Sequence, residues 1–291
     1  MSDKHSLFGV AASIAFFVWY KQAALFSLFQ GIYHAAAKEW PWLVLAVILL
    51  FILHFIKMIR YYLILSESQL PLREYLRLYL QVTLVNILIP FKLGEIFRFS
   101  MVAGKCKSAR LSILSIISER FFDTCIIVAV LIAQVVFLDG EFAAPLLFLA
   151  LFVVVCFLIY WTYSSTSRYL NRFFVLKPPK HSDLYYLQTI DYIDDLYDCE
   201  QKIIKGKGSL VLICSILAWL TEYFFFVALA ESFSLSFNMD IFSKYISSIL
   251  MVSPDFPPVF NTAYCVICIC IFTILYIWTV CYKKAKGVLC K

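Results

Sequence analysis

The stretch Pro90-Phe91-Lys92-Leu93-Gly94-Glu95-Ile96-Phe97-Arg98-Phe99-Ser100 places three charged residues and two helix breakers inside an otherwise apolar sequence. A second charged group, Glu119-Arg120-Phe121-Phe122-Asp123, follows downstream. The hydrocarbon core of a bilayer offers such groups no hydrogen-bond partners, so each one costs free energy unless protein or water satisfies it. The two groups together therefore predict a polar site held inside a membrane protein.

The rest of the chain has the composition of an integral membrane protein. Of its 291 residues, 63% are hydrophobic and 15% charged, and the mean hydropathy is +0.85. Runs long enough to cross a bilayer, about 20 residues of helix, occur at residues 7–28, 41–65, 111–138, 143–163, 209–231 and 262–282. We expect an all-α polytopic protein with six transmembrane helices in one membrane domain, residues 1–291. The first run has a signal-peptide alternative, but an uncleaved helix fits it better.

The distribution of lysine and arginine predicts the orientation in the membrane. Basic residues cluster at 105–110, 168–180 and 283–291, whereas the short connection 139–141 is acidic. Six crossings of the plasma membrane, with both termini in the cytoplasm, place the basic segments on the cytoplasmic side and the acidic connection on the outer side. The net charge of +6 comes from residues at helix ends and not from a soluble basic face, which excludes nucleic acid as a partner.

Residues 66–107 have the pattern of a re-entrant hairpin. The apolar segment 78–89 is too short to cross, Pro90 ends its helix, and Gly94 permits a tight turn. A backbone broken at membrane depth is tolerated only beside protein or a wet cavity, so the break predicts a cavity. A similar but weaker pattern occurs at 241–258, where a short apolar segment ends in a proline-rich sequence. This pattern indicates a second re-entrant segment and an inverted repeat. A proline-rich loop outside the membrane is the alternative.

The first charged group predicts a receptor for an anion. Glu95 and Arg98 lie three residues apart, on one face of a helix that begins near Gly94. The free amides of that helix start, with Arg98 and Lys92, would bind a phosphate, and Glu95 would orient Arg98. The alternative is a salt bridge at the membrane interface that anchors the hairpin.

The second charged group ends a polar stripe with three- and four-residue spacings, formed by Ser108, Ser112, Ser115, Glu119 and Asp123. Arg120 lies beside the stripe and is expected to pair with Asp123. Glu222 is a third intramembrane acid, which we expect to pair with Arg98 or Arg120. A purely structural network that joins helices is the alternative to a binding site.

The cysteines and histidines do not predict a metal site. Cys265, Cys268 and Cys270 lie inside an apolar span without histidine or carboxylate at ligand spacing. His54 has no acidic or cysteine neighbour in the sequence, so we expect a hydrogen-bonded packing histidine. No nucleotide-binding or catalytic motif is present either. We therefore expect no metal and no cofactor.

Residues 163–207 form the only sizeable stretch that we expect outside the membrane. Apolar residues recur there at helical spacing, at Leu187, Ile190, Ile193, Leu196 and Tyr197. This pattern predicts a cytoplasmic amphipathic helix that lies on the bundle or on the membrane surface. Docking of a partner protein on this segment is the alternative.

The two charged groups and the residues before them resemble the membrane domain of the lysylphosphatidylglycerol synthetase family, also described as flippase-like membrane proteins. The pattern of that family is matched by Asn86, Pro90, Gly94, Glu95, Arg98, Glu119, Arg120 and Asp123. The resemblance implies binding or translocation of anionic lipids or polyprenyl-linked intermediates. Some members also carry a soluble aminoacyl-transferase domain, which has no counterpart in this chain. The segment 253–258 lacks the glycine-rich sequence that usually follows the second proline.

We therefore expect an integral membrane protein that binds a phosphate-bearing lipid and moves it between leaflets. Lys92, Arg98 and Arg120 would hold the headgroup. Seven further residues would orient these groups or complete the network: Asn86, Pro90, Gly94, Glu95, Glu119, Asp123 and Glu222. One alternative is a component of lipid modification, such as lysyl transfer to phosphatidylglycerol with another domain or subunit. Another is an accessory partner of a membrane glycosyltransferase, which would dock on residues 163–207.

Overall fold

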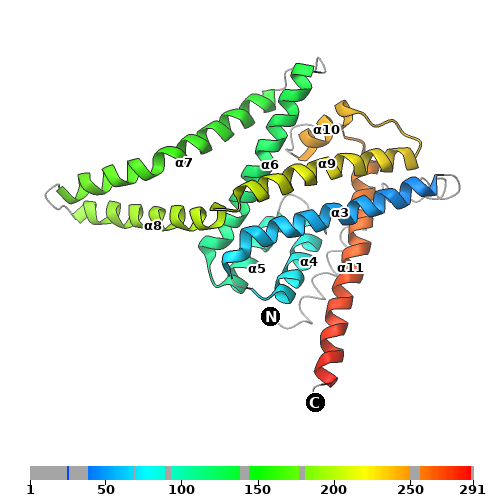
Figure 1. The fold of residues 1–291 in the computed structure, drawn as a ribbon, viewed down its shortest axis with the longest axis horizontal. Helices are drawn as coiled ribbons and strands as arrows, with labels where there is room; N and C mark the ends of the chain where they lie inside the picture. Colours follow the sequence, from blue (N-terminus) through cyan, green and yellow to red (C-terminus); the bar gives the residue numbers. More distant parts are fainter. Residues whose placement is uncertain are drawn as a thin grey trace.

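Figure 1 shows the computed structural model of the chain, in which every regular element of the described residues is a helix. The structure describes residues 25, 39–68, 70–88, 93–137, 144–176, 181–249 and 256–289. The expectation of an all-α polytopic membrane protein is confirmed. Except for Leu25, the predicted first span at 7–28 lies outside the described residues.

Four helices of the described residues are long and apolar enough to cross a bilayer. They are α3 (Trp40–Leu65), α7 (Ala144–Leu176), α9 (Gly208–Ser232) and α11 (Pro258–Leu289). A fifth helix, α6 (Ala109–Phe137), has 29 residues. Its first half carries Glu119, Arg120 and Asp123, which interrupt the apolar surface that a span in contact with lipid requires.

Two short helices form the region predicted as a hairpin. The helix α4 (Leu72–Leu88) ends before Pro90, and α5 (Leu93–Cys106) begins at the residue before Gly94. Residues 89–92, with Pro90 and Lys92, lie outside the described residues. A Cβ atom on Gly94 would lie 2.3 Å from the Asn86 Oδ1 atom and 2.6 Å from its Cα atom. Glycine is therefore the residue that lets α5 pack this closely against α4. The described residues before and after this connection form two separate helices, and the re-entrant hairpin and its depth in the membrane stay predictions.

The long helices α3 and α9 lie side by side, and α11 crosses next to α4 (Figure 1). The hydrophobic core of the bundle includes fully buried side chains of α3, α9 and α11, among them Leu50, Leu53, Phe225, Phe226 and Phe260. In contrast, only 6% of the apolar part of α7 is buried, against 39% for α9. A helix that exposes apolar side chains all round is expected where hydrocarbon surrounds it.

The helix α8 (His181–Ile204) lies within the segment 163–207 and packs beside α7 and α6, and the cytoplasmic amphipathic character of this segment stays a prediction. Ile190 is buried and Leu196 is half-buried, whereas Ile193 is exposed. Asp194 accepts hydrogen bonds from Tyr163, Ser167 and Asn171 at 2.8, 2.6 and 3.3 Å. Because α7 ends at Leu176, residues 163–176 of the segment belong to α7, and Asp194 of α8 bonds to three of them.

The second short apolar segment forms α10 (Met239–Ile249), and α11 begins at Pro258. Residues 250–255, with Pro254, lie outside the described residues. A short helix followed by a break and a long helix agrees with the pattern seen in the sequence. The re-entrant path of this segment and the inverted repeat stay predictions.

Candidate functional site

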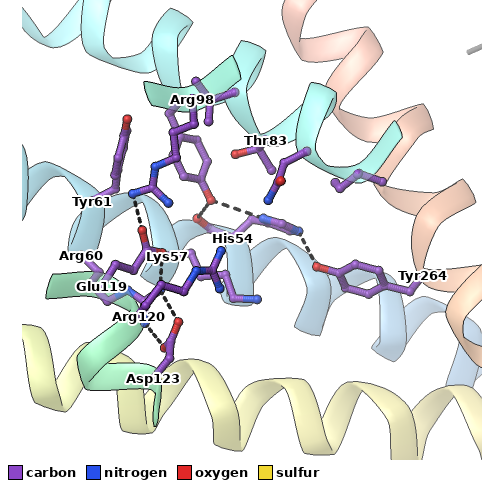
Figure 2. Close-up of a pocket in the computed structure, with 14 residues that line it drawn as sticks. His54, Lys57, Arg60, Tyr61, Thr83, Arg98, Glu119, Arg120, Asp123 and Tyr264 are labelled. Carbon is purple, nitrogen blue, oxygen red and sulfur yellow. Dashed lines mark hydrogen bonds and ion pairs between the residues drawn. The ribbon is translucent and has the colours of Figure 1, made fainter. Parts of the chain in front are cut away.

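Charged side chains from several helices meet at one cavity of about 190 Å³. Its walls come from α3, α4, α5, α6 and α11, and Figure 2 shows how their side chains converge. Its polar lining residues include His54, Lys57, Arg60, Asn86, Arg98, Glu119, Arg120 and Asp123. A polar cavity thus lies beside α4 and α5, and both charged groups of the sequence contribute side chains to it.

Glu119 bridges two arginines that come from different helices. Its carboxylate forms ion pairs with Arg60 of α3 and with Arg98 of α5. Arg60 also donates to both carboxylate oxygens of Asp123, at 2.5 and 3.3 Å, and to the Ser215 hydroxyl of α9 at 2.9 Å. Since Arg60 is only 2% exposed, this network fixes the positions of α3, α6 and α9 relative to one another.

Arg98 is buried beside the cavity, with 5% of its surface exposed. Its guanidinium carbon lies 4.7 Å from the centre of the Tyr61 ring, a cation–π contact. Glu95 lies one turn earlier on α5, and its Oε2 atom is 3.8 Å from the Arg98 Nη1 atom. The two residues therefore share a helix face. Glu95 also pairs with Arg120 of α6, whose side chain is 52% exposed. Arg120 is thus the most accessible cation of the network.

A separate ion pair lies beside the same cavity, where the Lys57 ammonium donates to the Glu222 carboxylate at 3.0 Å. The Tyr245 hydroxyl of α10 donates to the other oxygen of Glu222 at 2.5 Å. The prediction that Glu222 pairs with Arg98 or Arg120 is therefore wrong. The arginines are held by α6 and α5, whereas α9 lies against α3 and meets Lys57 first.

The site is electrically balanced. Four cations, Lys57, Arg60, Arg98 and Arg120, face four carboxylates, Glu95, Glu119, Asp123 and Glu222. Even so, the Nε atoms of Arg60 and Arg98 and the Oε2 atoms of Glu95 and Glu119 are buried without a hydrogen-bond partner in the described part of the chain. Buried polar groups in native proteins nearly always have partners, so the described side chains leave both donors and acceptors of this network unsatisfied.

The structure corrects one pairing within the second charged group. Arg120 was expected to pair with Asp123, but it pairs with Glu95 across the helix interface. The reason is helical geometry: Glu119 and Asp123 are four residues apart and face α3 together, whereas Arg120 is rotated by about 100° toward α5. In addition, the buried serines of the stripe do not take part in the ion-pair network of the acids. Ser112 and Ser115 are fully buried, and their hydroxyls donate to backbone carbonyls.

Three cavity residues on α3, Lys57, Arg60 and Tyr61, were missed in the sequence. Lys57 and Arg60 stand near the end of the apolar run 41–65, where basic residues ordinarily anchor a span at the interface. The informative signal was their spacing of three, which repeats that of Glu95 and Arg98. We found no reason in the sequence to single out Tyr61.

His54 is hydrogen-bonded, as predicted, but it also lines the cavity. Its Nδ1 atom lies 3.3 Å from the Tyr79 hydroxyl, and its Nε2 atom lies 3.5 Å from the Tyr264 hydroxyl. The Cys268 sulfur is 3.4 Å from Nε2, so a cysteine neighbour exists that the local sequence did not reveal. Asn86 lines the same cavity. Gly94 packs on Asn86, so both of these expected residues lie at the site.

One family model matches the chain over residues 6–255, and it is described as the lysylphosphatidylglycerol synthase TM region. The matched range contains both charged groups and the cavity residues of α3, α4, α5 and α6, whereas Tyr264 of α11 lies beyond it. No curated protein and no solved structure matches the chain.

Proposed function

Because the chain belongs to the lysylphosphatidylglycerol synthase TM-region family, we propose that it binds the headgroup of an anionic or polyprenyl-phosphate-linked lipid and moves that lipid between leaflets. It would do so in the plasma membrane, with both termini in the cytoplasm. The observation that carries this proposal is the convergence of three guanidinium groups, Arg60, Arg98 and Arg120, on the wall of one polar cavity.

A phosphate group fits this arrangement chemically. Guanidinium groups bind phosphate oxygens through charge-assisted hydrogen bonds, often two at once. Arg98 is prepositioned by Glu119 and by the Tyr61 ring, so little side-chain entropy is lost when an anion binds. Arg120 is the group that can move, because it is half-exposed and holds only the Glu95 carboxylate among the described residues. A headgroup phosphate would therefore take Arg120 from Glu95 while Arg98 stays in place.

The paired charges also explain how a headgroup could enter the bilayer. A charged group at the centre of a membrane helix costs about 2.5–3.5 kcal/mol on insertion scales, and a polar cavity offsets this cost. The close contact of Gly94 with Asn86 keeps the broken helices together beside that cavity. We propose that Lys92, in the connection between them, adds a further positive charge.

Lipid exchange between leaflets of proteoliposomes tests the proposal. Fluorescent phosphatidylglycerol in the inner leaflet becomes accessible to a membrane-impermeant quencher only after it moves. We expect Arg98→Gln and Arg120→Gln each to slow this movement about tenfold or more, the effect of losing one charge-assisted hydrogen bond of about 1.5–3 kcal/mol.

Lys105→Gln provides the matched control for the exchange assay. Lys105 lies on the same helix as Arg98, is 45% exposed and pairs with Glu74 away from the cavity. It should leave lipid movement unchanged. Equal rates in the wild type and in both arginine variants would refute the site assignment.

The word synthase in the family description favours one second function, a part in lipid modification such as lysyl transfer to phosphatidylglycerol. Such transfer would need another domain or subunit to supply the activated amino acid. Lysyl-lipid formation by the purified chain alone would establish this activity. Its appearance only after a soluble aminoacyl-transferase is added would assign the chain an accessory role.

A further inference from the structure

A second cavity, of about 230 Å³, lies between α3, α4 and α11. The described residues that line it are almost all apolar and include Met58, Leu80, Phe272 and Leu275. The Thr279 hydroxyl is a polar group at its wall, and it already donates to the Tyr276 carbonyl at 2.8 Å. This cavity offers a polar ligand little to bind, whereas a hydrocarbon would fill it without desolvation cost.

The apolar cavity and the polar cavity share a wall made of His54 and Tyr79, which line both. The Tyr79 hydroxyl donates to the His54 carbonyl at 3.1 Å. The His54 ring meets the Phe272 ring edge-on, with 4.5 Å between the centroids. The two cavities are thus separated by a single layer of side chains, polar on one side and aromatic on the other.

The same division runs along α3. This helix presents Lys57 and Arg60 to the polar cavity, and Phe51 and Phe55 to the apolar one. The residues of the two sets lie on adjacent faces of the helix, and His54 belongs to both. A charged site and an apolar site that are built on neighbouring faces of one helix match the two ends of an amphiphile.

We infer that the apolar cavity holds a hydrocarbon segment of the same lipid whose phosphate binds the polar cavity. This inference rests on the proposed function and adds where the chain of the lipid lies. A cavity of about 150 Å³ accommodates benzene, or roughly 25 Å³ per carbon atom, so this cavity holds roughly nine carbons. The cavity is open at the surface of the bundle, where Phe51, Phe55 and Trp278 of its wall are exposed, and its volume suits part of one chain.

Photolabelling with single-chain alkyl phosphates tests the inference. The probes are two dodecyl phosphates, one with a diazirine at carbon 6 and one with a diazirine at carbon 12, added to the protein in phosphatidylcholine nanodiscs. The carbon-6 probe should label residues of the apolar cavity, among them Leu80 and Leu275, and excess dodecyl phosphate should compete. The carbon-12 probe should label these positions at least about fivefold less, since about nine carbons fill the space.

A filled cavity should exclude the chain. We expect Leu275→Trp to reduce labelling by the carbon-6 probe about fivefold or more, because the larger side chain occupies the volume. Ile274→Trp is the matched control: Ile274 is the preceding residue of α11 and is 68% exposed, so the added ring points away. A thermal melt of both variants checks that the fold is kept.

The outcomes separate this inference from the proposed function. Competed labelling that depends on Arg120 but falls outside the apolar cavity, for example on α7, would overturn the inference and leave the phosphate site standing. Labelling that no alkyl phosphate competes, and that Arg120→Gln does not change, would overturn both. Equal loss of labelling in Leu275→Trp and Ile274→Trp would also overturn the placement of the chain.

Discussion

Arg60 is predicted to be the residue whose loss destabilises the helix bundle most. It is 2% exposed and joins Glu119 and Asp123 of α6 to Ser215 of α9. Arg60→Gln removes the cation and leaves the Asp123 carboxylate, whose side chain is only 15% exposed, without its ion-pair partner. The change therefore creates a nearly buried charge that nothing neutralises.

The size of the effect follows from these contacts. Removal of one partner from a buried ion pair costs about 3–5 kcal/mol of stability. We expect a loss near the lower end, about 3 kcal/mol, because Glu119 keeps its pair with Arg98. Asp123→Asn removes the charge that Arg60→Gln exposes, so the double variant should lose at least about 1 kcal/mol less than the sum of the single losses.

Unfolding in mixed micelles with increasing dodecyl sulfate, followed by circular dichroism, measures these free energies. Arg110→Gln is the matched control, since Arg110 pairs with Asp195 between side chains that are 43% and 58% exposed. An exposed pair of this kind contributes about 0–1 kcal/mol. Equal losses for Arg60→Gln and Arg110→Gln, or strict additivity in the double variant, would refute the reasoning.

Three further predictions concern other parts of the structure. Glu95→Gln frees Arg120 from its carboxylate, so the affinity for phosphatidylglycerol in nanodiscs should rise about fivefold, the equivalent of about 1 kcal/mol for a partly exposed pair; a fall in affinity would contradict the proposed competition. Gly94→Ala forces a methyl group into Asn86 and should cost about 1–3 kcal/mol, whereas Gly104→Ala meets no atom within 4 Å and should be neutral or slightly stabilising. Burial raises the pKa of the Glu200 carboxyl above its usual value, partly offset by the hydrogen bond from Ser118. The folded state therefore binds this proton more tightly than the unfolded state, so stability should fall as pH rises from the usual value through the raised one. In Glu200→Gln that slope should vanish from the unfolding free energy, and a slope that persists would contradict this assignment.

The break between α4 and α5 could be predicted from the sequence because its causes are local. Pro90 restricts the backbone at its own position and at the residue before it, whereas Gly94 lies inside α5 and acts through its close approach to Asn86. The shared faces of Glu95 with Arg98 and of Glu119 with Asp123 also follow from the helical repeat alone. The effect of Pro90 and these shared faces needed no knowledge of how the helices pack.

The partners across helices could not be predicted in the same way. Arg60 is separated by 59 residues from Glu119, and Lys57 by 165 from Glu222. Which acid each cation meets depends on the rotation and neighbours of α3, and those are set by packing against α9 and not by any local pattern. The contact between His54 and Cys268 could not be predicted either, because it also depends on how the helices pack. The true end of α7 depends likewise on Asp194 of α8, which bonds its last turns.

Lipid retention measures the central claim most directly: the polar cavity binds a phosphate headgroup. Native mass spectrometry of protein released from phosphatidylglycerol nanodiscs counts the lipids that remain bound to each chain. We predict one tightly retained phosphatidylglycerol in the wild type and in Lys105→Gln, and at least about tenfold less retention in the double variant Arg98→Gln, Arg120→Gln. Equal retention in all three proteins would contradict the claim.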